Sequence, residues 1–353
     1  MKSNMGFYDA SAPQLSNIDD ILSGKIANDF GFTTLLCNLY KLMDIKVQFV
    51  LTSSRDYIKF DPEFESYNFL QQYLLYFPSE GKYMDPSGTA LRFCYVSSDY
   101  THTYGLFVKE ITIGGLTTAV GKVKFIDALA YDMSTSNLFV TVDLTESITE
   151  PSVHVDNKMT GYYASGIQTV YELIPEESQD EVKKGYIEYI SGKEDLKNLE
   201  VKNATAEDFG INPFIVSADF TTTNFTEKAG PKVLFKAGNL IGAQAETYDE
   251  DERKQDIESD FNRKYYRELV IKLPDNYTLT NPEVMNSNVA YKDGDEITAI
   301  FASEYTITDN VMTVIVEEYY TTINYPKERI EEYKAVINAA ADFNKKVMIF
   351  EKK

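Results

Sequence analysis

The chain has very few of the side chains on which metal and nucleophilic chemistry depend. Its 353 residues include two cysteines, Cys37 and Cys94, and two histidines, His102 and His154. Two cysteines cannot make a multi-bridge disulfide framework or an all-cysteine zinc site. Two histidines leave little choice for a catalytic base. We therefore expect no cofactor and no metal.

Long apolar runs are also missing. No segment approaches the roughly 18 apolar residues that are needed to span a bilayer, so no transmembrane segment is expected. The first residues, MKSNMGFYDASAPQ, lack the apolar core of a signal peptide. The sequence thus indicates either a cytoplasmic protein or a processed or truncated piece of an exported one.

The chain also has few positively charged residues relative to acidic ones, and it has no tryptophan. Thirty-four Lys and Arg face 55 Asp and Glu, a formal net charge of −21. A surface this acidic repels phosphate backbones and anionic lipid headgroups, so nucleic acid is not an expected partner. Tryptophan is absent, but the chain has 26 Tyr and 21 Phe. Aromatic side chains fit half-buried pleated surfaces and favour a large β component.

The N-terminal region has the pattern of a small α+β core. Apolar residues recur at helical spacing over residues 32–43, and Asn28 or Asp29 is a suitable N-cap just ahead of them. Strands are expected over residues 46–52 and 68–77. A tight turn is expected at Asp85-Pro86-Ser87-Gly88.

From about residue 104 the pattern changes to many short strands bounded by turn residues, which is typical of an antiparallel β-sandwich. One strand is expected over 167–173, an amphipathic helix over 176–190, and a tight turn at Asp293-Gly294. Pro326 is well placed to begin a final helix, and a last strand is expected over 347–350.

Residues 18–87 resemble the transglutaminase-like branch of the papain-like cysteine peptidase superfamily. The helix TTLLCNLYKLMDI (33–45) is similar to the family's Leu-Leu-x-x-Leu-Leu-x-x-x-Gly-Ile helix, with Asp44 in place of Gly. The turn Met84-Asp85-Pro86-Ser87 is similar to the family's Leu-Asp-Pro-Thr. More broadly, the chain resembles the C-terminal two-thirds of bacterial envelope proteins in which such a core precedes a β-rich domain.

The resemblance breaks at the positions that carry the chemistry. It places the catalytic cysteine at Asp29, or at Asn28 in a register shifted by one. It places the histidine at Gln72, or at Gln71, and the aspartate that orients the histidine at Asp85. Thiol attack needs a thiolate, usually made by a neighbouring histidine at a helix N-terminus. We expect Asp29 to be a helix cap, Gln72 a spectator and Asp85 a turn-former.

Two other groups of residues could form a site, but each has a simpler interpretation. Cys94 and His102 could approach each other across a hairpin, although a core thiol and a surface imidazole are the simpler interpretation. Asp249, Asp251 and Asp256 invite a calcium interpretation, but their loop lacks the glycine and the terminal glutamate spacing of such a site.

The sequence as a whole predicts an α+β protein. Residues 1–103 should form a partial, degenerate transglutaminase-like (papain-like) core, and residues 104–353 an antiparallel β-sandwich domain with a C-terminal helix and strand. The resemblance implies a non-catalytic binding or scaffold protein of the periplasm or bacterial cell envelope, with a protein, peptide or glycan as ligand. The alternative is an active hydrolase or acyltransferase with an unrecognised site.

Overall fold

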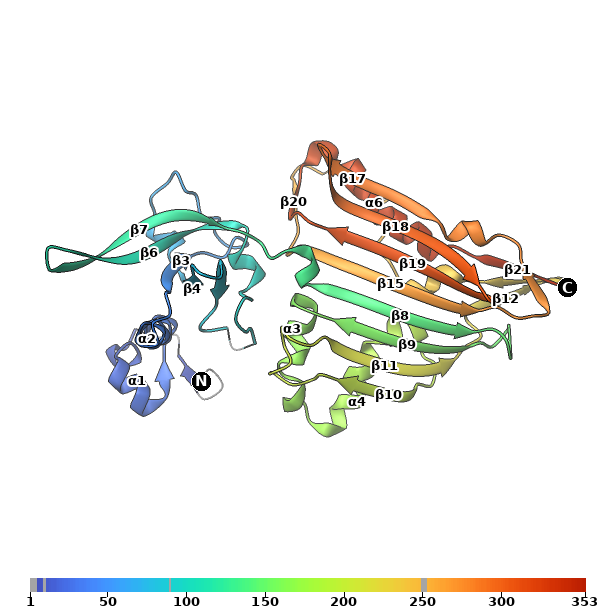
Figure 1. Cartoon of the computed structure of the whole chain (residues 1–353), viewed down its shortest axis with the longest axis horizontal. Coiled ribbons are helices and arrows are strands. Elements are labelled where there is room, and N and C mark those ends of the chain that lie inside the picture. Colours follow the sequence, from blue (N-terminus) through green and yellow to red (C-terminus); the bar gives the residue numbers. More distant parts are fainter. Residues whose placement is uncertain (1–4, 9–10, 89, 249–252) are drawn as a thin grey trace. The chain divides into compact units, whose positions relative to one another are not determined.

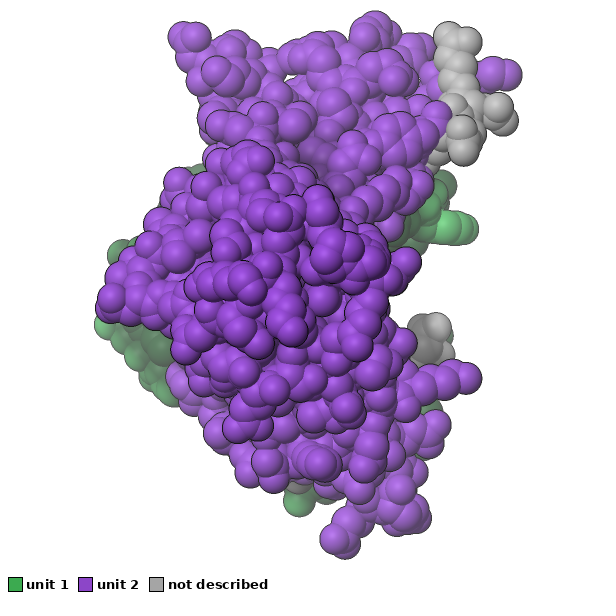
Figure 2. Space-filling view, turned by 90° about the vertical axis from the view of Figure 1, so that its right-hand side faces the viewer, with its two compact units in different colours: residues 1–129 green, residues 130–353 purple. Residues whose placement is uncertain are grey.

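The structure is a computed structural model that describes residues 5–8, 11–88, 90–248 and 253–353. The chain divides into two compact units, residues 1–129 (unit 1) and 130–353 (unit 2), which Figure 2 shows in separate colours. Both units combine helices with mainly antiparallel sheets, so the chain has the expected α+β class.

Unit 1 is built on one five-stranded antiparallel sheet, ordered β5-β4-β3-β6-β7. Its helices and strands are, in chain order, β1 (Gly6–Phe7), α1 (Ile18–Gly24), β2 (Ile26–Ala27), α2 (Asp29–Leu42), β3 (Gln48–Thr52), β4 (Gln72–Phe77), β5 (Lys82–Met84), β6 (Thr103–Ile113) and β7 (Leu116–Ile126). The expected strands 46–52 and 68–77 are thus β3 and β4. A 3-10 turn at Tyr67–Phe69 occupies the start of the second range.

The sheet of unit 1 has a separate small core on each face. One core packs α1 and α2 against β4 and β5 through Phe32, Leu35 and Leu75. The other lies on the opposite face and contains Val50, Leu74 and other buried side chains. Alternation along β4 explains the division, because successive side chains of a strand point to opposite faces.

The boundary between the units lies 26 residues later than the expected division after residue 103, at 129/130 instead (129 − 103 = 26). The reason is strand pairing: β6 hydrogen-bonds to β3 with Phe49 opposite Val108, and β7 pairs along the whole of β6. These two strands look like the start of a β-rich domain in the sequence, but they complete the sheet of unit 1.

Unit 2 is dominated by an eight-stranded sheet, ordered β10-β11-β9-β8-β15-β19-β18-β17 (Figure 1). Its helices and strands are, in chain order, β8 (Thr135–Asp143), β9 (Ser152–Met159), α3 (Tyr162–Gln168), α4 (Glu176–Gly185), α5 (Glu188–Ser191), β10 (Lys197–Lys202), β11 (Phe214–Thr221), β12 (Thr226–Ala229), β13 (Lys232–Phe235), β14 (Ile257–Glu258), β15 (Arg263–Lys272), β16 (Tyr277–Leu279), β17 (Ser287–Asp293), β18 (Glu296–Thr308), β19 (Val311–Tyr320), β20 (Asn324–Tyr325), α6 (Ile330–Asn344) and β21 (Met348–Lys352).

One face of this sheet, the inner face, carries the single large core of unit 2. The helix α6 and a four-stranded sheet, ordered β12-β13-β21-β16, contribute to the same core. In Figure 1, α6 lies behind β17 and β18, and Phe343 of α6 meets Phe301 of β18 with ring centroids 5.6 Å apart. The expected C-terminal helix and strand are therefore confirmed as α6 and β21. A 3-10 turn, Lys327–Arg329, separates Pro326 from α6.

Three expectations for unit 2 need correction. The large sheet is not purely antiparallel, because β8 and β15 run parallel at its centre. The range 167–173 is not a strand but the end of α3 followed by the 3-10 turn Tyr171–Leu173. The expected helix 176–190 is two helices, α4 and α5. The Asp293-Gly294 turn is confirmed between β17 and β18, with Gly294 at φ +59°.

Within the described residues, no helix combines the length and the apolar character required to cross a membrane.

Candidate functional site

The N-terminus of α2 is the position at which the resemblance places a catalytic cysteine. The helix begins at Asp29, and Asn28 is its N-cap, because the Asn28 side chain accepts a hydrogen bond from the Gly31 N–H at 2.8 Å. The side chain of Asp29 is exposed in the first turn, where a carboxylate is favoured by the helix dipole. The expectation that Asp29 caps the helix is therefore wrong, because Asn28 is the N-cap and Asp29 is the first residue of the helix.

Gln72 and α2 lie on opposite sides of the sheet of unit 1. Tyr73 of β4 contacts Phe30 of α2, with ring centroids 5.8 Å apart. Gln72 alternates with Tyr73 along the strand, so it shares a face with Leu74, which lies in the core away from α2. A base at position 72 would therefore point away from the first turn of α2.

Asp85 forms the expected turn. Its side chain is buried, and Oδ1 accepts hydrogen bonds from the Ser87 N–H at 3.1 Å and from the Gly88 N–H at 2.8 Å. The Ser87 hydroxyl donates to the same oxygen at 3.1 Å. A Cβ at Gly88 would lie 2.7 Å from Asp85 Oδ2, so the turn needs glycine there. The carboxylate is thus used by the turn that it begins.

The phenol of Tyr100 lies close enough to Asp29 and Asp85 to interact with the charges of both carboxylates. Burial raises the pKa of Tyr100 to about 12, and the charges of Asp85, Asp99 and Asp29 add to the rise. The structure therefore brings Asp29 and Asp85 to one region of unit 1, around a phenol that stays protonated at neutral pH. Neither position carries a thiol or an imidazole.

The two cysteines of the chain do not supply a reactive thiolate. Burial raises the pKa of Cys37, against the opposing charge of Lys41. Burial also raises the pKa of Cys94, against Lys82. Reactive cysteines have a lowered pKa, so both thiols have the character of structural residues.

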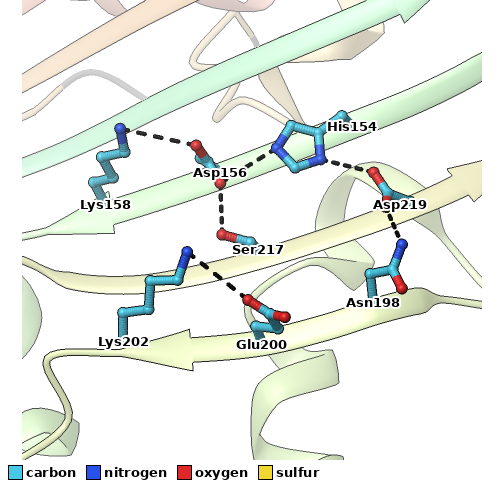
Figure 3. A network of polar contacts seen from close by, with 8 residues as sticks. All are labelled: His154, Asp156, Lys158, Asn198, Glu200, Lys202, Ser217 and Asp219. Atoms are coloured by element: carbon cyan, nitrogen blue, oxygen red, sulfur yellow. Dashed lines mark hydrogen bonds and ion pairs between the residues drawn. The ribbon is translucent and has the colours of Figure 1, made fainter.

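A second cluster of titratable groups lies in unit 2, on the face of the large sheet that points away from α6 (the open face). In Figure 1 no helix or strand of residues 130–248 or 253–353 covers this face. Figure 3 shows the cluster, which the sequence did not single out as a site: its members come from β9, β10 and β11 and are His154, Asp156, Lys158, Asn198, Glu200, Lys202, Ser217 and Asp219. The alternation of SVHVDNKM in β9 is the sequence signal that places His154 and Asp156 on one face.

His154 joins two carboxylates in this cluster. Its Nδ1 lies 2.7 Å from Asp219 Oδ1, and its Nε2 lies 3.4 Å from Asp156 Oδ1. Asn198 donates to Asp219 Oδ2 at 2.6 Å. Burial pushes the pKa of Asp219 upward, but the hydrogen bonds from Asn198 and His154 outweigh it and hold the pKa below its ordinary value. Asp219 therefore stays ionised down to low pH.

The cluster contains a serine, a histidine and carboxylates, but not in the order of a catalytic triad. In a triad the imidazole lies between the hydroxyl and the carboxylate and takes the hydroxyl proton. Here the Ser217 hydroxyl donates to Asp156 Oδ1 at 2.5 Å, and His154 Nε2 lies 3.4 Å from the same oxygen, so the carboxylate lies between the hydroxyl and the imidazole. This arrangement holds charges on a sheet surface and does not activate Ser217.

Aromatic rings lie beside these charges on the open face. Lys158 Nζ is 4.1 Å from the ring centroid of Phe139, and the rings of Phe139 and Tyr266 are 5.8 Å apart. The Tyr266 hydroxyl donates to Glu268 Oε2 at 2.9 Å. Rings flanked by charged groups offer both stacking surface and hydrogen-bonding partners.

The calcium interpretation cannot be followed, because Asp249 and Asp251 lie outside the described residues. Asp256, which is described, accepts a hydrogen bond from the Lys327 N–H at 2.9 Å. In the described part of the chain, no group of three or more His, Cys, Asp or Glu side chains is arranged to hold a metal ion.

Comparisons with known proteins place the chain in no family. No family model matches the chain. No curated protein matches it either. Among solved structures, it is similar to the crystal structure of a "putative protease" from Parabacteroides distasonis, with 9% sequence identity and a TM-score of 0.45. The alignment covers 99% of this chain and 49% of that one, so the chain spans about half the length of that protein.

Proposed function

We propose that the protein is a non-catalytic binding or scaffold protein with a degenerate transglutaminase-like core, and that it acts in the bacterial cell envelope. The observation that carries the proposal is the set of residues at three positions of unit 1: the start of α2, the start of β4 and the Asp85 turn. A helix N-terminus and an Asp-Pro-Ser turn are present, but Asp29 and Gln72 stand where the resemblance places the cysteine and the histidine.

The remaining polar groups of that region have structural partners. Asn28 caps α2, and Asp85 accepts the hydrogen bonds of its own turn. Gln72 lies on the sheet face away from α2. Since the pKa values of Cys37 and Cys94 are raised, neither thiol is activated to replace the missing nucleophile.

The open face of unit 2 is the surface that we assign to binding. It combines the rings of Phe139 and Tyr266 with the charges around His154 and Asp219. A peptide or a glycan suits this surface, because both present apolar patches for the rings and polar groups for the charged side chains. The cell-envelope location rests on the family resemblance alone.

A turnover screen tests the absence of catalysis. The wild-type protein and an Asp29→Ala/Asp85→Ala variant are incubated with peptide, glutamine-donor and ester substrates. We expect both proteins to give only the buffer rate. Turnover by the wild type that the double variant loses would overturn the proposal and favour an active hydrolase or acyltransferase.

An array of peptides and glycans tests the binding surface. We expect the wild type to bind a subset of the peptides or glycans on the array, and a Phe139→Ala/Tyr266→Ala variant not to bind them. Tyr67→Ala is the matched control, because Tyr67 is an exposed tyrosine (91% exposed) in unit 1. Ligands that the open-face variant retains as well as the wild type does would contradict the assignment of this surface.

A further inference from the structure

The inner face of the large sheet in unit 2 contains a polar cavity. Its volume is about 350 Å³, within the range of small-molecule sites. The floor comes from β8, β9, β15 and β19, and the opposite wall from α5, α6 and the segment around Ile241–Ala245. All of these elements belong to unit 2.

Three charged side chains line the cavity among the described residues: Arg263, Arg267 and Glu318. Arg267 donates to Glu318 Oε2 at 2.9 Å, and these side chains are only 6% and 7% exposed. The other oxygen of Glu318 accepts from the Tyr320 hydroxyl at 2.8 Å. Both oxygens of Glu318 are therefore occupied, and one positive charge of the cavity has no counter-charge.

Arg263 carries that charge. Its guanidinium lies over the ring of Tyr320, 4.3 Å from the ring centroid. Among the described residues, none accepts a hydrogen bond from this guanidinium and no carboxylate pairs with it. A guanidinium has five N–H donors in a planar fork that fits a carboxylate with two parallel hydrogen bonds. The ring of Tyr320 thus holds the guanidinium of Arg263 in place, and the N–H donors of the guanidinium remain available to a ligand.

Asn157 is the second side chain of the cavity with an unmet requirement. It is 3% exposed, and its Nδ2 donates to the Tyr186 carbonyl at 3.0 Å. That bond fixes the orientation of the amide. Its Oδ1 is then a buried acceptor, and within the described part of the chain it has no partner. A buried polar atom without a partner is costly, so a donor from a bound molecule would stabilise it.

The separation of the two groups indicates the size of that molecule. Leu138 lies opposite both Arg267 on β15 and Asn157 on β9, so Asn157 is two strands across from β15 and level with a residue four positions from Arg263. Two strand spacings and four extended residues place the backbones of Arg263 and Asn157 roughly 16 Å apart. A dipeptide spans roughly 7 Å, and a hydrogen bond at each end adds roughly 3 Å. The side chains of Arg263 and Asn157, which both line the cavity, cover the rest of the distance.

The geometry points to a binding site for a small carboxylate-bearing molecule of dipeptide length. Its carboxylate would bind the fork of Arg263, and an ammonium or hydroxyl group at its other end would donate to Asn157 Oδ1. A single carboxylate matches the one uncompensated positive charge, whereas a phosphate dianion would leave a net negative charge in the cavity. This inference does not depend on the proposed function, which concerns the opposite face of the sheet.

Calorimetry with alanyl-alanine as the probe tests the inference in the full chain. Its C-terminal amide is the matched ligand control, since it keeps the ammonium group and lacks the carboxylate. We expect the dipeptide to bind and the amide to bind roughly tenfold more weakly or worse, because hydrogen bonds to charged groups are the stronger ones. Equal binding of the acid and the amide, or no binding of the acid at millimolar concentration, would overturn it.

Two variants locate the site. Arg263→Gln removes the charge and the fork, and we expect it to weaken dipeptide binding by the same factor of roughly ten. Lys264→Gln is the control, because Lys264 is the next residue of β15, points to the open face and pairs there with Glu317 at 2.9 Å. We expect that variant to bind the dipeptide as the wild type does.

Retained dipeptide binding in Arg263→Gln would refute a carboxylate site at Arg263. Binding of inorganic phosphate to the wild type as tightly as the dipeptide would refute it too. The comparison of acid and amide in the wild type stands even if Arg263→Gln proves unstable.

Discussion

The region of unit 1 around the start of α2 and the Asp85 turn differs from the inner face of unit 2 in how completely the chain satisfies its own polar groups. In unit 1, Asn28 accepts from the Gly31 N–H and hydrogen-bonds the Ser16 side chain, and Asp85 accepts from its own turn. In unit 2, Arg263 and Asn157 Oδ1 have no hydrogen-bond partner among the described residues. The chain itself satisfies the polar groups of the first region. The second contains groups that only a bound molecule or solvent can satisfy.

The largest expected effect is at the buried ion pair of unit 2. Arg267→Met leaves Glu318 charged and buried without its partner, and breaking such a pair typically lowers the free energy of unfolding by about 3–5 kcal/mol. Urea unfolding followed by circular dichroism gives the total change, and hydrogen exchange at β15 and β19 assigns it to unit 2.

The double variant Arg267→Met/Glu318→Leu serves as the control. It removes both charges, so we expect it to recover much of the lost stability. A loss below about 1 kcal/mol in the single variant would mean that the pair is solvated and that this face is less buried than described.

A smaller effect is expected at the turn of unit 1. Asp85→Ala removes the acceptor of three hydrogen bonds, so the N–H groups of Ser87 and Gly88 lose their acceptor. We expect the free energy of unfolding to fall by about 1–3 kcal/mol. Asp85→Asn keeps an acceptor oxygen and should cost much less. Unfolding of unit 1, followed by hydrogen exchange in β4 and β5, distinguishes the two variants. If Asp85→Asn lowered the stability as much as Asp85→Ala, the contribution of Asp85 would come from its negative charge and not from the hydrogen bonds of the turn.

The smallest effect separates two neighbouring residues at the start of α2. Asn28→Ala removes the N-cap and should lower the stability of unit 1 by about 1 kcal/mol. Asp29→Ala removes a favourable charge in the first turn, which should cost about 0.3–1 kcal/mol at low salt and less at high salt. Urea unfolding at low and high salt measures both. If Asp29→Ala lowered the stability more than Asn28→Ala does, Asp29 and not Asn28 would be the N-cap.

Much of the fold was predictable because its signals are local. The helical spacing of Phe32, Leu35 and Leu36 identifies α2, and the Asp293-Gly294 pair identifies the hairpin between β17 and β18. The apolar stripe after Pro326 identifies α6. Each of these signals lies within a few residues of the structure that it specifies.

The division into units was not predictable, because strand pairing is a tertiary choice. The sequence of β6 and β7 fits either a core sheet or a sandwich, and the pairing of β6 with β3 decides between them. The parallel neighbours β8 and β15 are likewise far apart in the sequence. The sequence predicts a strand over 167–173, where the structure has helical turns, because short apolar runs do not distinguish a strand from a helix by their period.

The sites show the same contrast. The turn at Asp85 follows from its own neighbours, so the sequence predicted its structural role. The cavity around Arg263 draws on β8, β9, β15 and β19 and on helices far along the chain, so no local pattern identifies it. The one available sequence signal was the spacing of Arg263, Tyr265 and Arg267, which places all three on one face of a strand.

The parallel pair at the centre of the large sheet also constrains how unit 2 is made. Thr135 of β8 lies opposite Lys264 of β15, so more than half of the unit is synthesised before the central pairing exists. Until then β8 is an edge strand with open hydrogen-bonding groups, although it ends buried in the middle of the sheet. Contacts this distant in sequence form slowly, because the intervening loop must close first. The strands of unit 2 that leave the ribosome first must therefore wait for β15, and one edge of β8 stays open until β15 arrives.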